Sequence, residues 1–252
     1  MNRLASRPRV GWLLAGMLVI LLAALLRSRL QDRAPVLKAA ELQAFNDSAG
    51  TMLGRHVAGR FPGGRVLLIV RPGAENGGGT AEEKALLDGF RNAVEGKLQI
   101  AGIVAPQAPA GYREQLSAKV AAGEVLERDV GLILSTPSMW YDTRGLADLV
   151  RARSEAISLI VSTTALPDDF PGAPELAAQL PPVALLLAPV LNPGRLLDSG
   201  RVEAMVVFKP AGAWTMPDAP EKDAVRAFDS RYLLIHAGNR GDMQRLHPGV
   251  FR

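Results

Sequence analysis

Short apolar runs alternate with longer amphipathic segments along most of the chain. An uninterrupted apolar run of about four to eight residues is typical of a strand that is buried on both faces of a parallel sheet. We expect such strands at residues 66–70, 98–104, 130–134, 157–161, 183–187, 202–208 and 232–235.

The segments between these runs carry helix signals. Thr80 can cap a helix over residues 80–95, in which Glu82 and Glu83 suit the positively charged end of the helix dipole, and Gly96 ends it. Further helices are expected at residues 112–122, 146–153, 174–180, 193–199 and 223–228. Strands that alternate with helices predict an α/β fold, a doubly wound, mostly parallel Rossmann-like sheet with helices on both faces.

Residues 10–26 form an apolar run of a different kind, with Arg9 before it and Arg27 after it. A helix rises about 1.5 Å per residue, so this one covers roughly 25 Å of a hydrocarbon core that is about 30 Å thick. A cleaved signal peptide and a buried core helix are the alternatives. A signal peptide needs small residues at its cleavage site, but Leu25 and Leu26 follow Ala24. We therefore expect an uncleaved signal-anchor, a single-pass transmembrane helix.

Arginines flank this helix on both sides, so the positive-inside rule gives no clear orientation. Because long domains are translocated largely regardless of their charge, we favour a cytoplasmic tail at residues 1–9 and an extracytoplasmic domain. In a bacterial cell this places the protein in the inner membrane with a periplasmic domain. Small residues on the helix could pack against another membrane helix, with Gly11, Trp12 and Ala15 as the expected contacts.

A linker helix is expected within residues 27–62, since Phe45, Ala49, Leu53 and Val57 fall at helical spacing. It would join the membrane segment to the domain, or pack on the surface of the domain or on a partner. The Rossmann-like domain is then expected at residues 63–237. A polar C-terminal tail follows at residues 238–252.

The chain has a basic pI of about 9.7, but its excess positive charge lies near the N-terminus. Residues 1–33 hold six arginines and one aspartate of the 29 basic and 25 acidic residues, which leaves 23 basic and 24 acidic residues in the rest. The positive charge therefore belongs to the membrane segment, and we expect no nucleic-acid partner. The chain has no cysteine, which excludes disulfides, thiol nucleophiles and thiolate metal sites.

Polar side chains that follow the expected strands are candidate ligand contacts, because ligands of such sheets bind beyond the carboxyl ends of the strands. The alternative role of these hydroxyls is to cap helices or to satisfy backbone groups at strand ends. The candidates are Arg71, Ser135, Thr136, Ser162, Thr163, Thr164 and Lys209.

The motifs of several enzyme classes are absent. The glycine run before Thr80 lacks the dinucleotide and P-loop patterns, and the chain has neither an HExxH nor a GxSxG sequence. Asp168 and Asp169 could form a metal or acid–base pair, but adjacent carboxylates in a proline-flanked loop are more often solvated turn residues. We expect no metal, no cofactor and no catalytic site.

Aromatic residues are scarce in this chain, and three of them fall in expected loops: Trp140, Tyr141 and Trp214. Aromatic loop residues often contact partner proteins, and they also often cover the edge of a core. They are our candidate partner contacts in the domain.

The order of elements resembles one lobe of a type I periplasmic binding protein, and it is similar to bacterial proteins with an N-terminal anchor and one such lobe. The residues that carry this resemblance are the anchor, residues 63–70 and residues 228–234. Binding proteins of that class enclose a ligand between two lobes, whereas this chain has residues for one. The resemblance therefore implies the fold but transfers no binding residue.

Two functions follow from these observations. The first is a non-catalytic, single-pass accessory subunit, whose extracytoplasmic domain docks on a larger membrane protein complex. The alternative is a membrane-tethered domain that binds or senses a small polar ligand.

Overall fold

The computed structural model describes residues 37–251, apart from residues 154, 191–192, 211–212 and 216–221. A six-stranded sheet lies at the centre of this part of the chain, in the order β2-β1-β3-β4-β5-β6. Neighbouring strands run parallel except for β6, which is antiparallel to β5. The strands are β1 (Arg65–Ile69), β2 (Gln99–Val104), β3 (Leu159–Ser162), β4 (Val183–Leu186), β5 (Val202–Phe208) and β6 (Tyr232–His236).

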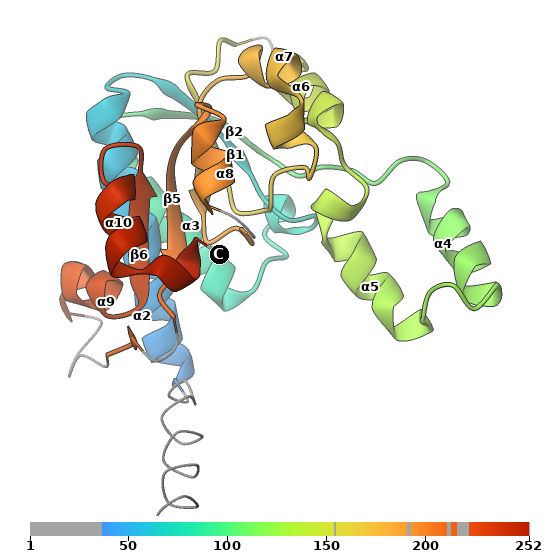
Figure 1. Cartoon of the computed structure of the whole chain (residues 1–252), viewed down its shortest axis with the longest axis horizontal. Helices are drawn as coiled ribbons and strands as arrows, with labels where there is room; N and C mark the ends of the chain where they lie inside the picture. The colour runs from blue at the N-terminus through green and yellow to red at the C-terminus, as the bar shows by residue number, and fades with distance from the viewer. Residues whose placement is uncertain (1–36, 154, 191–192, 211–212, 216–221, 252) are drawn as a thin grey trace, which may run out of the picture.

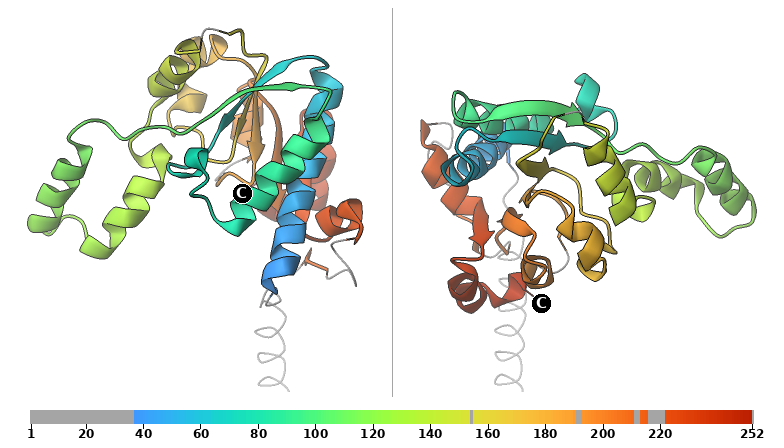
Figure 2. Two further views of the ribbon diagram at one scale, coloured as in Figure 1. Left: turned by 180° about the vertical axis from the view of Figure 1, so that it is seen from behind. Right: turned by 90° about the horizontal axis from the view of Figure 1, so that it is seen from above.

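Helices cover both faces of the sheet (Figures 1 and 2). One face packs against α2 (Ala39–Arg60), α3 (Ala81–Val94) and α9 (Ala224–Arg231). The other packs against α6 (Thr143–Arg151), α7 (Pro174–Ala178), α8 (Pro193–Asp198) and α10 (Arg240–Leu246). The Rossmann-like prediction is therefore confirmed for the sheet and its two helical layers.

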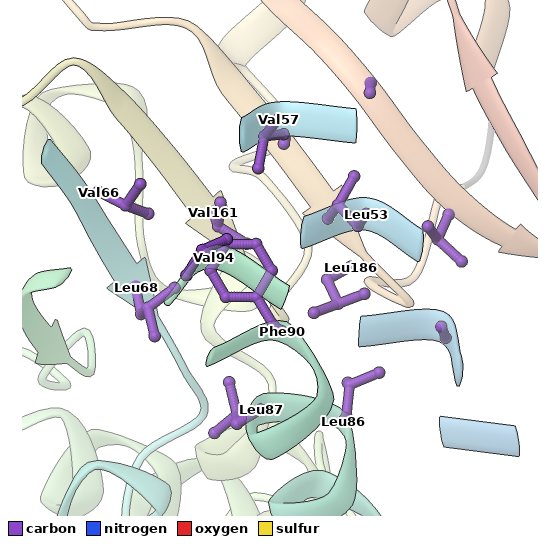
Figure 3. Close-up of a cluster of buried hydrophobic side chains, with 14 of the residues drawn as sticks. Leu53, Val57, Val66, Leu68, Leu86, Leu87, Phe90, Val94, Val161 and Leu186 are labelled. Carbon is purple, nitrogen blue, oxygen red and sulfur yellow. The ribbon is translucent and has the colours of Figure 1, made fainter. Parts of the chain in front are cut away.

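The strands are apolar throughout because both of their faces are covered. Leu67 and Ile69 point into the core on the α6 side, whereas Val66 and Leu68 point into the core on the α2 side. Figure 3 shows the core on the α2 side, where Phe90 of α3 lies among side chains of β1, β3 and α2. Successive side chains of a strand point to opposite faces, so a continuous apolar run fills two cores at once.

Helix α3 begins as its sequence predicts. The hydroxyl of Thr80 accepts a hydrogen bond from the backbone N–H of Glu83, and the carboxylate of Glu83 accepts one from the backbone N–H of Thr80. This reciprocal pair is a capping box, which satisfies two backbone donors that the helix leaves free.

Glycines bring α2 and α3 unusually close together. A Cβ added to Gly50 of α2 would lie 2.0 Å from the backbone oxygen of Leu86, and one added to Gly89 of α3 would lie 2.1 Å from the backbone oxygen of Asp47. Both distances are far shorter than a van der Waals contact. The two helices can therefore lie side by side only because neither residue has a side chain.

The strand that we expected at residues 130–134 is a helix instead, α5 (Glu127–Ser135). Glu127 and Asp129 stand in its first turn, where carboxylates favour the helix dipole, and the hydroxyl of Thr136 donates back to the carbonyl oxygen of Leu132. A short apolar run does not by itself distinguish a strand from a helix. Together with α4 (Tyr112–Ala121), α5 forms a helical hairpin between β2 and α6.

Helix α2 is an integral part of the domain. Phe45, Ala49, Leu53 and Val57 are at most 1% exposed, so of the arrangements considered for the linker helix the structure shows packing on the domain. The chain also remains ordered into helices beyond residue 237, where Met243 of α10 packs on the core.

The expected transmembrane helix, with Gly11, Trp12 and Ala15, lies outside the described residues. Among the helices that the structure describes, none is both long and apolar enough to cross a bilayer.

The α2–α3 contact gives a first test. The substitution Gly89→Ala places a methyl group against the backbone of α2, and overpacking of this kind should cost about 1–3 kcal/mol of the free energy of unfolding, or more. Gly59→Ala is the matched control, because Gly59 is exposed on α2 and an added Cβ meets nothing within 4 Å. Alanine there should stabilise the helix by up to about 1 kcal/mol. Urea unfolding of both variants checks the two signs, and a neutral Gly89→Ala would contradict this packing.

Candidate functional site

A pocket with a volume of about 400 Å³ opens beyond the carboxyl ends of β3 and β4. Its walls come from the loops that follow these two strands, from the start of α8 and from the short 3-10 helix η2 (Pro137–Met139). The lining residues are Ser138, Ala165, Leu166, Pro167, Asp168, Pro171, Pro189, Val190, Arg195 and Leu196.

Prolines and local hydrogen bonds shape the loop after β3. The hydroxyl of Ser162 donates to the carbonyl oxygen of Thr164 at 2.9 Å and accepts from the N–H of Thr164 at 3.2 Å, so the chain turns at once on leaving the strand. Asp169 then accepts hydrogen bonds from the backbone N–H and the hydroxyl of Thr143, at 3.0 and 2.9 Å. The contact of Asp169 with Thr143 fixes the loop to the buried first turn of α6.

The two adjacent aspartates thus have different environments. Asp169 is held by Thr143, whereas Asp168 lines the pocket and has no hydrogen bond or ion pair within the part of the chain that the structure describes. Arg195 brings the opposite charge to the same pocket, and both side chains are exposed at its rim. Most of the other lining residues are apolar. The pocket therefore combines an apolar wall with one hydrogen-bond acceptor of negative charge, one donor of positive charge and the hydroxyl of Ser138.

The hydroxyls that we singled out in the sequence mostly bond to their own neighbourhood. Ser162 and Thr164 are paired in the turn after β3, and the hydroxyl of Thr163 reaches the carbonyl oxygen of Ile69 at 3.5 Å. Ser135 and Thr136 do not join this group, because they end α5 rather than a strand. The structure therefore brings three of the five hydroxyls together, close to the pocket loop but not among its lining residues.

Arg71 lies at a second, smaller pocket of about 190 Å³ beside the glycine-rich loop after β1. Its Nε donates to Oε1 of Glu83 at 2.6 Å, and this hydrogen bond holds the pKa of the Glu83 carboxyl below its usual value. Since Glu83 also completes the capping box, the one cation at this loop already has an anionic partner. The loop consequently offers little net positive charge to an anionic ligand.

Lys209 and Trp214 belong to a cluster at the far edge of the sheet. Lys209 donates from Nζ to the carbonyl oxygen of Asp229, and Nε1 of Trp214 donates to the carbonyl oxygen of Lys209 at 2.7 Å. The guanidinium of Arg231 lies 4.6 Å from the centre of the Trp214 ring and 5.3 Å from that of Phe208. This cluster fastens the chain after β5 through cation–π contacts.

Trp140 and Tyr141 lie at the root of the α4–α5 hairpin. Nε1 of Trp140 donates to the carbonyl oxygen of Ile133 at 3.0 Å, and its ring lies 6.4 Å from those of Tyr112 and Tyr141. Burial raises the pKa of the Tyr141 hydroxyl. Whether these aromatic residues also contact a partner stays a prediction.

A histidine pair lies on the α2 side of the antiparallel strands β5 and β6, and neither residue lines either pocket. The rings of His56 and His236 stack at 4.9 Å, and Oε1 of Glu203 lies 3.9 Å from Nε2 of His56 and 2.8 Å from Nε of Arg60. Burial lowers the pKa of His56 most, and the electrostatic effects of His236 and Arg60 lower it further against the opposing effect of Glu203. His56 is therefore held as a neutral side chain.

Sequence reasoning missed most of the pocket-lining residues. The available signal was the spacing of Pro167, Pro171 and Pro189 in the loops after two predicted strands, with a charged residue beside them. Asp168 was considered as a metal or acid–base residue, but Arg195 was assigned only to a helix. Within the described residues no group of three histidine, aspartate or glutamate side chains could hold a metal ion.

Comparison with known proteins gives a likeness of fold. No family model matches the chain, and no curated protein matches it. Among solved structures, a carbohydrate transporter solute binding protein from Agrobacterium radiobacter in complex with D-arabinose is 14% identical over 84% of this chain and 63% of that one, with a TM-score of 0.44. The glucose-galactose binding protein GanP from Geobacillus stearothermophilus is 17% identical over 77% and 61%, with a TM-score of 0.42.

A galactofuranose binding protein is 13% identical over 82% of this chain and 64% of that one, with a TM-score of 0.43. The chain thus spans less than two thirds of the length of these solute-binding proteins. The weak resemblance that we expected from the sequence is confirmed, at low identity and partial coverage. It identifies no ligand for this chain.

The histidine pair predicts an acid-sensitive domain. The folded state lowers the pKa of His56, so the unfolded state binds more protons and stability falls as the pH falls through the usual range of histidine titration. Between about pH 7.5 and about pH 5.5, the melting temperature of the wild type should drop more than that of His56→Gln. His247→Gln, at the end of α10, should keep the full drop. Equal pH profiles for the wild type and His56→Gln would remove His56 as the source.

Proposed function

We propose that this chain is a small-ligand-binding domain that takes a polar molecule into the pocket beyond β3 and β4. The observation that carries the proposal is the pocket itself, which combines a suitable position, an apolar wall and charges of both signs. In open α/β sheets, ligands bind outside the carboxyl ends of the strands.

The size of the pocket supports a ligand with the dimensions of a monosaccharide or an amino acid. Its volume of about 400 Å³ falls within the range of about 300–1,000 Å³ that is usual for small-molecule sites. Asp168 can accept hydrogen bonds from hydroxyl or ammonium groups, and Arg195 can donate to hydroxyl or carboxylate oxygens. The apolar wall of proline, leucine and valine side chains suits the carbon skeleton of such a molecule.

Our proposal includes the membrane tether expected from residues 10–26, with the domain on the extracytoplasmic side. The support for it is the length and the arginine flanks of the apolar segment. Docking on a larger membrane protein complex remains a second proposal for the same chain. The exposed apolar residues Leu126, Leu132 and Met139 near the α4–α5 hairpin favour a protein contact of some kind.

A ligand screen tests the binding proposal. Pentoses, hexoses and amino acids should be added to the purified protein, and its melting temperature followed. A ligand at a hundred times its Kd stabilises the folded state by about 2.7 kcal/mol, which corresponds to a rise in Tm of about 5–10 °C for a domain of this size.

Variants of the pocket show whether the ligand binds there. Asp168→Asn and Ser138→Trp should remove most of the shift in Tm, because the first removes a charged acceptor and the second fills the pocket. Asp148→Asn is the matched control, since Asp148 is paired with Arg151 on α6 and does not line the pocket. A shift that survives both pocket variants, or the absence of any shift, would falsify the proposal.

A further inference from the structure

The loop between β1 and α3 contains a chemically reactive pair of residues. Asn76 is the one asparagine in the sequence that a glycine follows, Gly77. The side-chain amide of an asparagine can react with the backbone nitrogen of the next residue. Glycine allows this reaction best, because it has no side chain to block the approach and its backbone adopts many conformations. Asparagine is accordingly one of the thermolabile residues that are rarer in heat-stable proteins.

The structure leaves the side chain of Asn76 accessible. Asn76 ends a single 3-10 turn, η1 (Ala74–Asn76), and both Asn76 and Gly77 are exposed to solvent. Within the described chain, the amide of Asn76 makes one hydrogen bond, from Nδ2 to Oε1 of Glu75 at 3.4 Å. This distance exceeds the usual range of about 2.7–3.2 Å for such a bond. The amide is therefore only loosely held.

The backbone nitrogen of Gly77 is also weakly held. Its N–H donates to the carbonyl oxygen of Ala74 at 3.2 Å, and this bond closes the 3-10 turn. Gly77 has a φ of 81°, and a Cβ added to it would meet nothing within 4 Å. The space around the residue is thus open. One long hydrogen bond has to break before this nitrogen can approach the side chain of Asn76.

The other asparagines in the part of the chain that the structure describes are better protected. Asn46 is buried in α2, and both ends of the Asn239 amide make hydrogen bonds, at 2.8 and 2.9 Å. Asn92 is exposed, as Asn76 is, but it lies in α3 and Ala93 follows it. The backbone N–H groups in the body of a helix donate to the carbonyl four residues earlier. Asn76 therefore combines exposure, a following glycine and a weak local turn.

We propose that Asn76 is a site of spontaneous deamidation, at which the backbone nitrogen of Gly77 attacks the side-chain carbonyl carbon of Asn76. The new bond from this nitrogen to Cγ closes a five-membered succinimide ring. The bond from Cγ to Nδ2 breaks, and Nδ2 leaves as ammonia with the proton that the backbone nitrogen gives up. Water then opens the ring. Attack at Cγ gives aspartate, and attack at the main-chain carbonyl carbon gives isoaspartate.

Both products change the charge of the loop, and one also changes its backbone. A carboxylate replaces the neutral amide, so the hydrogen bond to Glu75 is lost and two like charges become neighbours. Isoaspartate also adds one carbon to the main chain between Ala74 and Gly78, both of which line the smaller pocket. The reaction therefore alters this loop as the protein ages. It does not depend on the ligand that we propose for the larger pocket.

Timed peptide mapping tests the proposal in the purified full chain. The folded protein is kept at mildly alkaline pH, where the backbone nitrogen loses its proton more readily, and samples are digested at mildly acidic pH, where the reaction is slow. Mass spectrometry then follows the conversion of amide to acid in the peptides that contain Asn76 and Asn92. Isoaspartate is detected with an isoaspartate-specific methyltransferase and a labelled methyl donor.

We expect the peptide with Asn76 to convert at least ten times faster than the peptide with Asn92, with isoaspartate among its products. Asn76→Gln is the matched control. Glutamine keeps an amide at this exposed position, but its longer side chain would have to close a larger ring, so the conversion should disappear. Equal rates at Asn76 and Asn92, or a conversion in this peptide that persists in Asn76→Gln, would overturn the proposal.

A second measurement separates the effect of the structure from that of the sequence. The same peptides are followed in guanidinium chloride, where the chain is unfolded, and circular dichroism confirms that the untreated sample is folded. Because the loop holds Asn76 and Gly77 only weakly, the rate at Asn76 in the folded protein should lie within tenfold of the rate in the unfolded chain. A folded protein that reacts more slowly than this would show that the loop protects Asn76, against the proposal.

Discussion

The close approach of α2 and α3 is the contact on which the rest of the domain depends. The strands are apolar on both faces, so the sheet must be covered on both sides, and one side is closed mainly by these two long helices. They can lie together because Gly50 and Gly89 leave room for the facing backbone. The hydroxyl of Tyr232 then donates to Oδ1 of Asn46 at 2.9 Å, which joins the start of α2 to the last strand, 186 positions away. One helix near the start of the described chain thus holds the end of the sheet.

The opposite face is built differently, and this difference positions the pocket. Helices α7 and α8 have only five and six residues, so the chain after β3 and after β4 spends more of its length in loops. These loops are stiffened by prolines and by the contact of Asp169 with Thr143, and they enclose space where longer helices would have filled it. At β1 the capping box and the Arg71–Glu83 ion pair occupy the corresponding position.

Much of the fold could be predicted from the sequence because its strands are buried on both faces. Continuous apolar runs gave six strands to within a few residues, and the capping pattern at Thr80 and Glu83 gave the start of α3. The run at residues 130–134 was assigned wrongly, because four apolar residues with a glycine among them fit either a buried strand or a short helix. The length of α5 and its acidic first turn decide for the helix.

The site was harder to predict than the fold because it is made of loops. The hydroxyls after β3 were correctly expected at the end of a strand, but they bond to one another and to the backbone of the same turn. Arg71 stands at a strand end as expected, yet its charge is matched by Glu83, twelve residues later. A single sequence shows which polar residues follow a strand. Which of them remain unpaired, as Asp168 does within the described residues, depends on where the loops cross.

The pocket and the α4–α5 hairpin meet at one short segment, η2, and this has a thermodynamic consequence. Ser138 of η2 lines the pocket, while Trp140, at the end of the same 3-10 helix, donates to the carbonyl oxygen of Ile133 in α5. A ligand that shifts η2 therefore acts on the root of α5, and a contact on α5 acts on the wall of the pocket. Coupling of this kind is reciprocal in free energy, so any change in ligand affinity on forming a contact at α5 equals the change in that contact on ligand binding. A rigid η2, held by the ring contacts of Trp140 with Tyr112 and Tyr141, would transmit such a change over a short distance.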